Sequence, residues 1–171
     1  MRLFLTGFMG SGKSYVGRRL ADRLGLPFLD LDDLVEEQTK TTIAELFARV
    51  GESSFRDLES TMLRELDNLP MFVLATGGGT PCFHDNMQWM NGQGTTVFLD
   101  THPEIIGARL ADERDKRPLL HGPEDLPTLI RRRLEDRREC YASAKIHVVH
   151  DNPEDDVVRL VESRLNAHRP N

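Results

Sequence analysis

Cysteine and lysine are scarce in this sequence, and it contains no long apolar run. The two cysteines, Cys82 and Cys140, form no CxxC pair and are too few for a disulfide framework or a cysteine-based zinc site. The apolar opening segment, residues 2–7, is far too short for a signal-peptide core or a membrane-spanning helix. We therefore expect a protein of the reducing cytoplasm with no membrane partner.

An excess of positive charge is also missing. The chain has 28 acidic residues against 22 lysines and arginines, which gives a net charge of −6. Its overall field repels DNA, so no nucleic-acid partner is expected, and an anionic ligand must be met by a local cluster of donors. Four of the basic residues are lysines and 18 are arginines, and arginine suits two-point capture of phosphate or carboxylate.

Apolar segments of strand length alternate with longer helical segments along the 171 residues, a length typical of one domain. Strands are predicted at about 3–6, 27–29, 71–75, 95–99 and 146–149. Helices are predicted at about 13–24, 42–50, 54–66, 101–110 and 126–142, and from 152 onward. Five strands that alternate with helices indicate an α/β fold, with a parallel sheet covered on both faces.

Several helix boundaries have a sequence signature. Thr42 and Thr101 each open a Thr-x-x-Glu capping box, which marks a helix start. Gly51 is expected to end the first of these helices. Pro153, flanked by Asn and Glu, is expected near the first position of the last helix.

Residues 7–14, Gly-Phe-Met-Gly-Ser-Gly-Lys-Ser, match the phosphate-binding P-loop pattern GxxxxGK[ST]. The match follows a predicted strand and opens a predicted helix, where backbone N–H groups and the helix N-terminus can surround phosphates. Lys13 would reach the β- and γ-phosphates of ATP, and Ser14 would ligate Mg²⁺. The nucleotide contacts expected in this segment are Gly10, Ser11, Gly12, Lys13, Ser14 and Tyr15.

A P-loop identifies a nucleotide but not the use made of it. GTPase switches carry an N-K-x-D motif that reads the base, and this sequence has none. Motor and transport ATPases are far longer than this chain. A short chain with an early P-loop therefore points to a kinase of a small molecule or a nucleotide.

Three further features lie where an acceptor would bind. Asp30 and Asp32 leave the second strand on a segment expected to be extended, so that both face the crevice; the alternative is the acid-rich start of a solvated helix. Gly77–Gly79 either lets backbone approach a ligand or forms a flexible turn. Arg117 lies in residues 112–125, a segment of mobile-loop composition, and is either a lid arginine that closes on the phosphates or a solvated loop residue.

Together these motifs resemble the shikimate kinase family over nearly the whole chain. The family's motifs are the GxxGxGKS loop, an acidic D-x-D, a Gly-Glu followed by Phe-Arg, a triple glycine, an R-P-L-L lid and an R-x-x-x-Y. They are matched in the same order at residues 7–14, 30–32, 51–56, 77–79, 117–120 and 137–141.

The resemblance implies that ATP phosphorylates shikimate at its 3-hydroxyl, with Mg²⁺, on a five-stranded parallel sheet of strand order 2-3-1-4-5. It implies one kinase domain over residues 1–171, with a shikimate-binding region at about 31–60 and a lid at about 112–125; we expect a monomer. Lys13, Asp32 and Arg117 would be catalytic. The resemblance further implies that shikimate is bound by Asp32, Arg56, Gly78, Gly79 and Arg137. Magnesium would be bound by Ser14 and, through water, by Asp30. Arg117 would contact the phosphates, and Arg109 would contact the adenine.

The sequence departs from the family pattern at three places. Glu139 stands where the family often has proline, which leaves Arg138 as a neighbouring candidate for the role of Arg137. Ala75-Thr76 precedes the triple glycine where many members have a serine, and the segment after the last strand, residues 150–153, is short.

Two other functions remain open from the residues. One is a kinase of another small hydroxylated acid such as gluconate, which the pair Arg56 and Arg137 beside Asp32 disfavours. The other is a P-loop protein that binds ATP as a sensor without transferring phosphate.

Overall fold

A computed structural model of the chain describes residues 1–111, 113, 120 and 123–168. Five parallel strands form one sheet in the order β2-β3-β1-β4-β5. The strands are β1 (Arg2–Thr6), β2 (Phe28–Asp30), β3 (Phe72–Ala75), β4 (Thr95–Thr101) and β5 (Ile146–His150). The predicted fold class and strand order are therefore confirmed.

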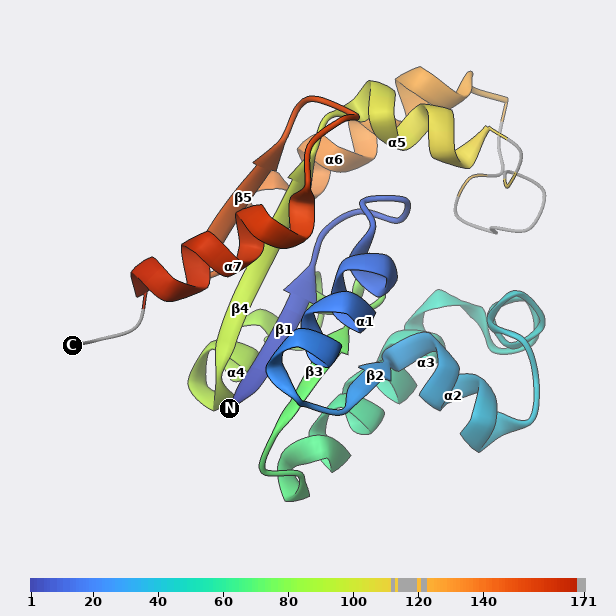
Figure 1. Cartoon of the computed structure of the whole chain (residues 1–171). Helices are drawn as coiled ribbons and strands as arrows, with labels where there is room; N and C mark the ends of the chain where they lie inside the picture. Colours follow the sequence, from blue (N-terminus) through green and yellow to red (C-terminus); the bar gives the residue numbers. More distant parts are fainter. Residues whose placement is uncertain (112, 114–119, 121–122, 169–171) are drawn as a thin grey trace.

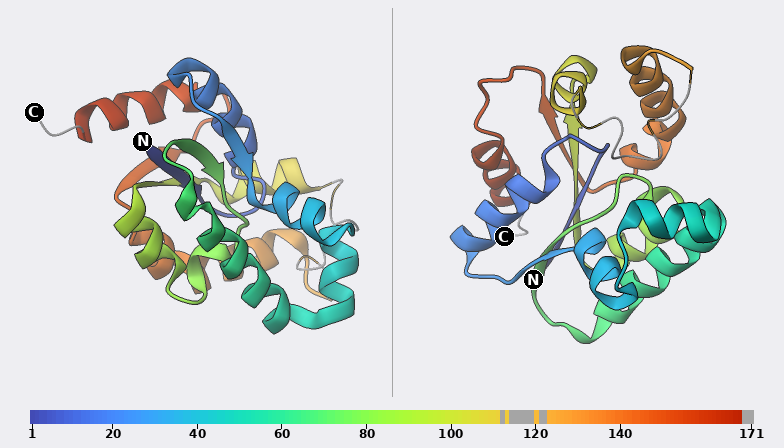
Figure 2. Two further views of the ribbon diagram at one scale, coloured as in Figure 1. Left: turned by 90° about the horizontal axis from the view of Figure 1, so that it is seen from below. Right: turned by 90° about the vertical axis from the view of Figure 1, so that its right-hand side faces the viewer.

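Helices cover both faces of this sheet (Figures 1 and 2). The α-helices are α1 (Lys13–Leu24), α2 (Leu31–Thr39), α3 (Ile43–Glu65), α4 (Asn86–Gln93), α5 (Pro103–Leu110), α6 (Leu126–Ala142) and α7 (Val157–His168), and the short 3₁₀ helices are η1 (Leu66–Asn68) and η2 (Thr80–Cys82). One face packs against α1 and α7, and the other packs against α2, α3, α4 and α6.

The alternation of side chains along β1 produces these two layers. Leu3 and Leu5 lie in the core shared with α1 and α7, whereas Phe4 lies in the core on the opposite face. All three side chains are fully buried, because successive residues of a strand point to opposite faces and both faces of a parallel sheet are covered.

Three predicted helix boundaries are corrected by the structure. The capping box at Thr42 is present, but helical residues continue past Gly51, where φ is 78° and ψ is 171° and the helix is kinked rather than ended. Thr101 belongs to β4, and His102 caps α5 instead. The last helix starts at Val157, because residues 152–155 form a turn before it.

Helix α4 has no counterpart in the prediction, and α2 corresponds only to the alternative given for Asp30 and Asp32, the start of an acid-rich helix. Helix α2 begins directly after β2: the Asp30 carboxylate accepts a hydrogen bond from the backbone N–H of Asp32 at 3.1 Å and caps the helix. Asp32 thus lies in a first helical turn, and the expected extended segment is wrong. Helix α4 contains Gly92 and two asparagines, which are poor helix formers, so its sequence carries little helical signal.

Most of the predicted lid, including Arg117, lies outside the described residues. Within the described part of the chain, no helix is both long enough and apolar enough to cross a membrane.

Candidate active site

The P-loop joins β1 to α1 at the carboxyl edge of the sheet. Gly10 and Gly12 have φ values of 77° and 98°, a left-handed conformation that favours glycine, so the loop folds back before the helix starts. The Lys13 ammonium is buried and donates hydrogen bonds to the carbonyls of Gly7 and Phe8 at 2.8 and 3.0 Å. The loop therefore holds a positive charge and a helix N-terminus where phosphates would bind.

A hydroxyl and a carboxylate meet beside the loop. Ser14 at the start of α1 donates a hydrogen bond from Oγ to Oδ2 of Asp30 at 2.5 Å. Oxygen ligands of this kind suit Mg²⁺, which usually takes one or two protein oxygens, several waters and the phosphates of a nucleotide. The donor set predicted for magnesium is therefore assembled.

Two clefts open on either side of the P-loop. The first, of about 610 Å³, lies between the loop, the helices α2 and α3, and the triple glycine. The second, of about 720 Å³, lies between the loop, α1, Arg109 and the segment that leads from β5 into α7. Gly10, Gly12 and Tyr15 line both clefts, so two ligands could meet over the loop.

Asp32 faces the first cleft close to the triple glycine. A Cβ placed on Gly77 would lie 3.3 Å from Oδ1 of Asp32, 2.6 Å from Oε1 of Glu59 and 2.7 Å from Oγ1 of Thr80. Only glycine allows the backbone to approach these polar groups so closely. The helix α2 and the loop after β3 are thereby packed together around Asp32.

Arg56 is held rigidly beside the same loop. Its side chain is buried and its guanidinium binds the buried carboxylate of Glu59, which also accepts a 2.7 Å hydrogen bond from Thr80. A Cβ on Gly79 would overlap the Arg56 guanidinium. The Nε of Arg56 is buried without a hydrogen-bond partner among the described residues.

Arg137 approaches the triple glycine from α6. It is 8% exposed, and its Nη1 is buried without a hydrogen-bond partner in the described part of the chain. A Cβ on Gly78 would lie 3.6 Å from this nitrogen. The next residue, Arg138, points to solvent and pairs with Glu135 at 2.9 Å. Of the two arginines, Arg137 is therefore the one next to the triple glycine, and α6 continues through Glu139, which stands in place of the family proline.

Tyr141, one turn further along α6, ties this helix to the loop. Its hydroxyl donates a 2.5 Å hydrogen bond to the carbonyl of Gly78. Burial raises the pKa of the Tyr141 phenol, and the charges of Arg137 and Arg56 oppose that rise. The phenol therefore stays protonated and keeps its hydrogen bond at neutral pH.

Comparisons with known proteins identify the family. A family model described as shikimate kinase matches residues 9–165. The shikimate kinase of Bacteroides fragilis is 46% identical over 175 residues, which covers 98% of each chain. The chain belongs to the shikimate kinase family. A crystal structure of shikimate kinase from Bacteroides thetaiotaomicron has a TM-score of 0.87 at 40% identity, covering 97% of this chain and 98% of that one. A structure of the Acinetobacter baumannii shikimate kinase in complex with shikimate has the same TM-score of 0.87 at 35% identity, covering 97% of this chain and 91% of that one.

Membership of the shikimate kinase family confirms the identification made from the six motifs. Nothing in these comparisons favours the gluconate kinase or the ATP sensor. The region at 31–60 expected to bind shikimate supplies α2 and much of α3, which line the first cleft.

The second cleft contains the residues expected near the adenine of ATP. Arg109 donates a hydrogen bond from Nη1 to the Gly10 carbonyl at 2.9 Å, and burial lowers the pKa of its guanidinium. Pro153, from the short segment after β5, also lines this cleft. Tyr15 is exposed, with the Arg19 guanidinium 3.7 Å above its ring centre.

Sequence reasoning missed two features of this site. The first is the packing role of Glu59 and Tyr141, which hold the predicted arginine and glycine residues in place; the only signal for Tyr141 was its place in the R-x-x-x-Y match. The second is a disulfide bond between Cys82 and Cys140, a pairing that the count of cysteines gave no reason to expect. At the departure from the family pattern before the triple glycine, Thr76 is buried and donates from Oγ1 to the Leu5 carbonyl at 3.0 Å.

Proposed function

We propose that the chain transfers the γ-phosphoryl group of ATP to the 3-hydroxyl of shikimate, giving shikimate 3-phosphate and ADP, with the acceptor in the first cleft, the phosphates at the P-loop between the two clefts, and the adenosine part of the nucleotide in the second cleft. The observation that carries this assignment is the pair of buried guanidinium groups, Arg56 and Arg137, on either side of the Gly78–Gly79 backbone. Arg56 lines the first cleft together with Asp32, and Arg137 lies next to Gly78, which also lines that cleft.

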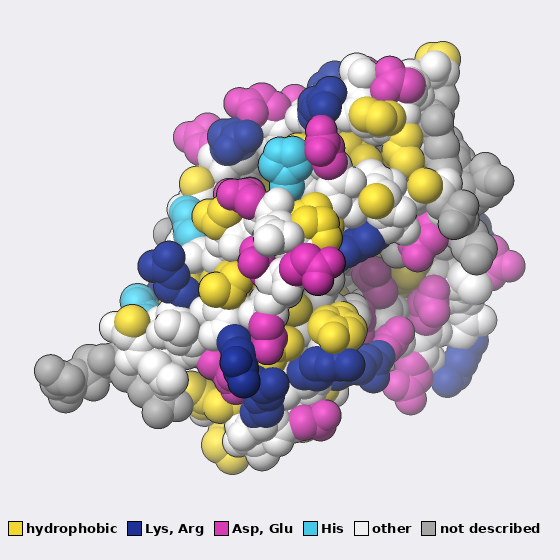
Figure 3. Space-filling model, turned by 45° about the horizontal axis from the view of Figure 1, so that its top comes forward, with side chains coloured by type: hydrophobic (Ala, Val, Ile, Leu, Met, Phe, Trp, Pro, Cys, Tyr) yellow, Lys and Arg dark blue, Asp and Glu magenta, His cyan; other side chains and the backbone are white. Residues whose placement is uncertain are grey.

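The two arginines would bind the carboxylate of shikimate. Arg56 Nε and Arg137 Nη1 are buried donors without partners in the described residues, and a buried donor without a partner is costly unless a ligand completes it. A planar carboxylate can accept from two guanidinium groups at once. Basic and acidic side chains are interspersed on the face drawn in Figure 3, so local donors rather than a basic surface would attract this anion.

Asp32 would orient the acceptor hydroxyl. Its carboxylate lies beside Gly77, and Asp32 lines the first cleft together with Lys13 and Ser14 of the P-loop. A carboxylate there accepts a hydrogen bond from the 3-hydroxyl, aligns the oxygen with the γ-phosphorus, and takes up the proton as the new O–P bond forms.

Lys13 and the loop backbone would hold the phosphates of ATP. The ammonium now donates to the carbonyls of Gly7 and Phe8, and a bound phosphate would be a stronger acceptor for it. Ser14 and, through water, Asp30 would hold Mg²⁺, which when bound supplies charge neutralisation between the phosphates. Arg117 would contact the transferring phosphate from the lid, and Arg109 would lie against the adenine.

Positioning and charge stabilisation would supply most of the rate in this arrangement. The transferring phosphoryl group is a charged fragment between two oxygens, so fixed positive groups and a correctly aligned hydroxyl lower the barrier. No covalent intermediate with the protein is needed.

A panel of acceptors tests the assignment. ADP release should be supported by shikimate at a kcat/KM at least about 100-fold above that for gluconate, because a site with buried polar groups rejects ligands that leave them unpaired. Shikimate methyl ester, which keeps the hydroxyls but lacks the charge, should bind far more weakly than shikimate. If the ester were used as well as the acid, the arginine pair would not be a carboxylate site.

We also propose that the protein is a cytoplasmic monomer in which residues 1–171 form one kinase domain. Sedimentation velocity should give one species near 19.5 kDa; a dimer that persists on dilution would contradict the proposal.

A further inference from the structure

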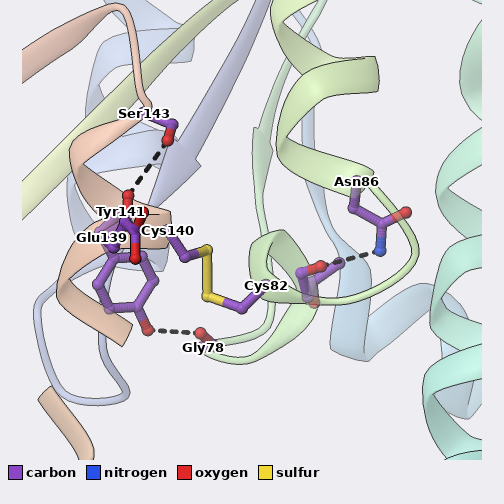
Figure 4. The surroundings of a disulfide bond; sticks show 8 residues. Gly78, Cys82, Asn86, Glu139, Cys140, Tyr141 and Ser143 are labelled. Carbon is purple, nitrogen blue, oxygen red and sulfur yellow. Dashed lines mark hydrogen bonds between the residues drawn. A yellow bond between two sulfur atoms is a disulfide. The ribbon is translucent and has the colours of Figure 1, made fainter. Parts of the chain in front are cut away.

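A disulfide joins two segments that flank the proposed carboxylate site. Cys82, at the end of η2, is bonded to Cys140 of α6, with the two Cα atoms 5.5 Å apart (Figure 4). The two cysteines are 58 residues apart in the sequence. Cys82 follows Gly79 by one turn of η2, and Cys140 follows Arg137 by about one helical turn. The bond therefore connects the glycine side of the site to its arginine side.

Short hydrogen bonds connect each cysteine, or its neighbour, to the glycine residues of the site. The backbone N–H of Cys82 donates to the Gly79 carbonyl at 3.0 Å, so the sulfur anchors the turn that presents Gly79. On the other side Tyr141, next to Cys140, donates to the Gly78 carbonyl at 2.5 Å. The loop and α6 are thus held together by one covalent bond and one hydrogen bond.

The disulfide can be reached from solvent without opening either substrate cleft. Both cysteines are partly exposed and line a shallow surface cavity of about 440 Å³, together with Asp85, Asn91 and Ser143. Neither cysteine lines the first or the second cleft. A small thiol could therefore reduce the bond while ATP and shikimate are bound.

We propose that the Cys82–Cys140 disulfide is a redox-sensitive positioning element for shikimate. When it is intact, it fixes Gly78 and Gly79 relative to Arg137; when it is reduced, the two sides separate more easily and shikimate binds more weakly, while ATP binding is unchanged. This proposal rests on the proposed function of the first cleft.

The redox step is an ordinary thiol–disulfide exchange. A thiolate of an external dithiol attacks one sulfur, the S–S bond breaks to give a mixed disulfide, and the second thiol of the reagent releases the other half. The two cysteines gain two electrons and two protons and become thiols, and the dithiol is oxidised to its cyclic disulfide. No other reactant is needed.

The expected effect is moderate, because the hydrogen bond from Tyr141 to Gly78 survives reduction. Loss of one positioning contact corresponds to a change of about 2- to 10-fold in affinity. We therefore expect the KM for shikimate to rise by about 2- to 10-fold on reduction, with the KM for ATP unchanged. In a Tyr141→Phe variant, which loses the other link, the same reduction should have a larger effect.

The experiment compares one preparation of the full chain in two redox states. The protein is oxidised by a mild disulfide reagent or reduced with dithiothreitol, the state is verified by intact mass after thiol alkylation, and KM is measured for both substrates. The controls are Cys82→Ser and Cys140→Ser, in which dithiothreitol should change nothing and the KM for shikimate should equal that of the reduced wild type. Thermal melts verify that each variant is folded, and reoxidation of the wild type should restore the low KM.

Three results would overturn the inference: failure of the bond to form under mild oxidation, an equal KM for shikimate in the two verified states, or a parallel change in the KM for ATP. Failure of the proposed function is distinguishable, because it would abolish shikimate-dependent ADP release in both redox states.

Discussion

Replacement of Arg137 by alanine tests the proposed carboxylate site, because the structure distinguishes this buried arginine from its exposed neighbour Arg138. Arg137 is 8% exposed, and its Nη1, next to Gly78, has no hydrogen-bond partner among the residues that the structure describes. The adjacent Arg138 has a side chain 68% exposed and pairs with Glu135 on the surface. Arg138→Ala is therefore a matched control, since it removes the same charge from the same helix without touching the cleft.

The magnitude follows from the burial of the pair. Removal of one partner of a desolvated, hydrogen-bonded charge pair costs about 2–5 kcal/mol, and each 1.4 kcal/mol is about tenfold in affinity. Because Arg56 still holds the carboxylate, we expect the lower part of this range, a loss of about 30- to 300-fold in shikimate affinity. Arg138→Ala should change shikimate affinity less than about twofold, because an exposed ion pair contributes little.

Titration calorimetry with shikimate and, separately, with a non-hydrolysable ATP analogue measures both affinities. Arg137→Ala should weaken shikimate binding and leave nucleotide binding within about twofold of the wild type, and a thermal melt should verify folding. Equal losses for the two ligands would show that Arg137 serves the nucleotide or the fold. Equal losses in Arg137→Ala and Arg138→Ala would show that only the overall charge matters.

Three further substitutions have clear expected outcomes. Lys13→Met should lower kcat at least about 100-fold, since transition-state charge is left unbalanced; steady-state kinetics check this, and near-normal turnover would remove the P-loop assignment. Gly79→Ala should raise the KM for shikimate more than that for ATP, because the added Cβ overlaps the Arg56 guanidinium; an unchanged KM would show that Arg56 is not needed in its present place. Arg117→Ala should lower kcat more than shikimate affinity, because its charge matters most during transfer; a change in binding alone would contradict its role on the lid.

The sequence predicted the sheet and the phosphate side of the site because both depend on local patterns. Residues 13–24 and 126–142 were predicted as helices with the bounds that the structure has. The strands were short apolar runs, and the P-loop has a fixed spacing that brings its lysine and hydroxyl together by itself. The roles of individual site residues stay predictions.

Local sequence patterns could not predict the contacts between segments that are distant in the sequence. The buried carboxylate of Glu59 binds Arg56 about one turn earlier on α3 and also accepts a hydrogen bond from Thr80 on η2, and no local signal in the sequence marks that second contact. The sequence also could not separate Arg137 from Arg138, because their side chains differ only in which face of α6 they occupy. The disulfide of Cys82 joins residues whose proximity arises from the packing of η2 on α6.

One measurement tests the central claim most directly. ADP release is coupled to a spectroscopic readout with ATP and Mg²⁺ present, with and without shikimate, and the organic product is identified by mass and phosphorus NMR. The account predicts ADP release that depends on shikimate, with one equivalent of shikimate 3-phosphate formed per ADP. ADP release that is independent of shikimate, or phosphate attached to any other hydroxyl, would contradict it.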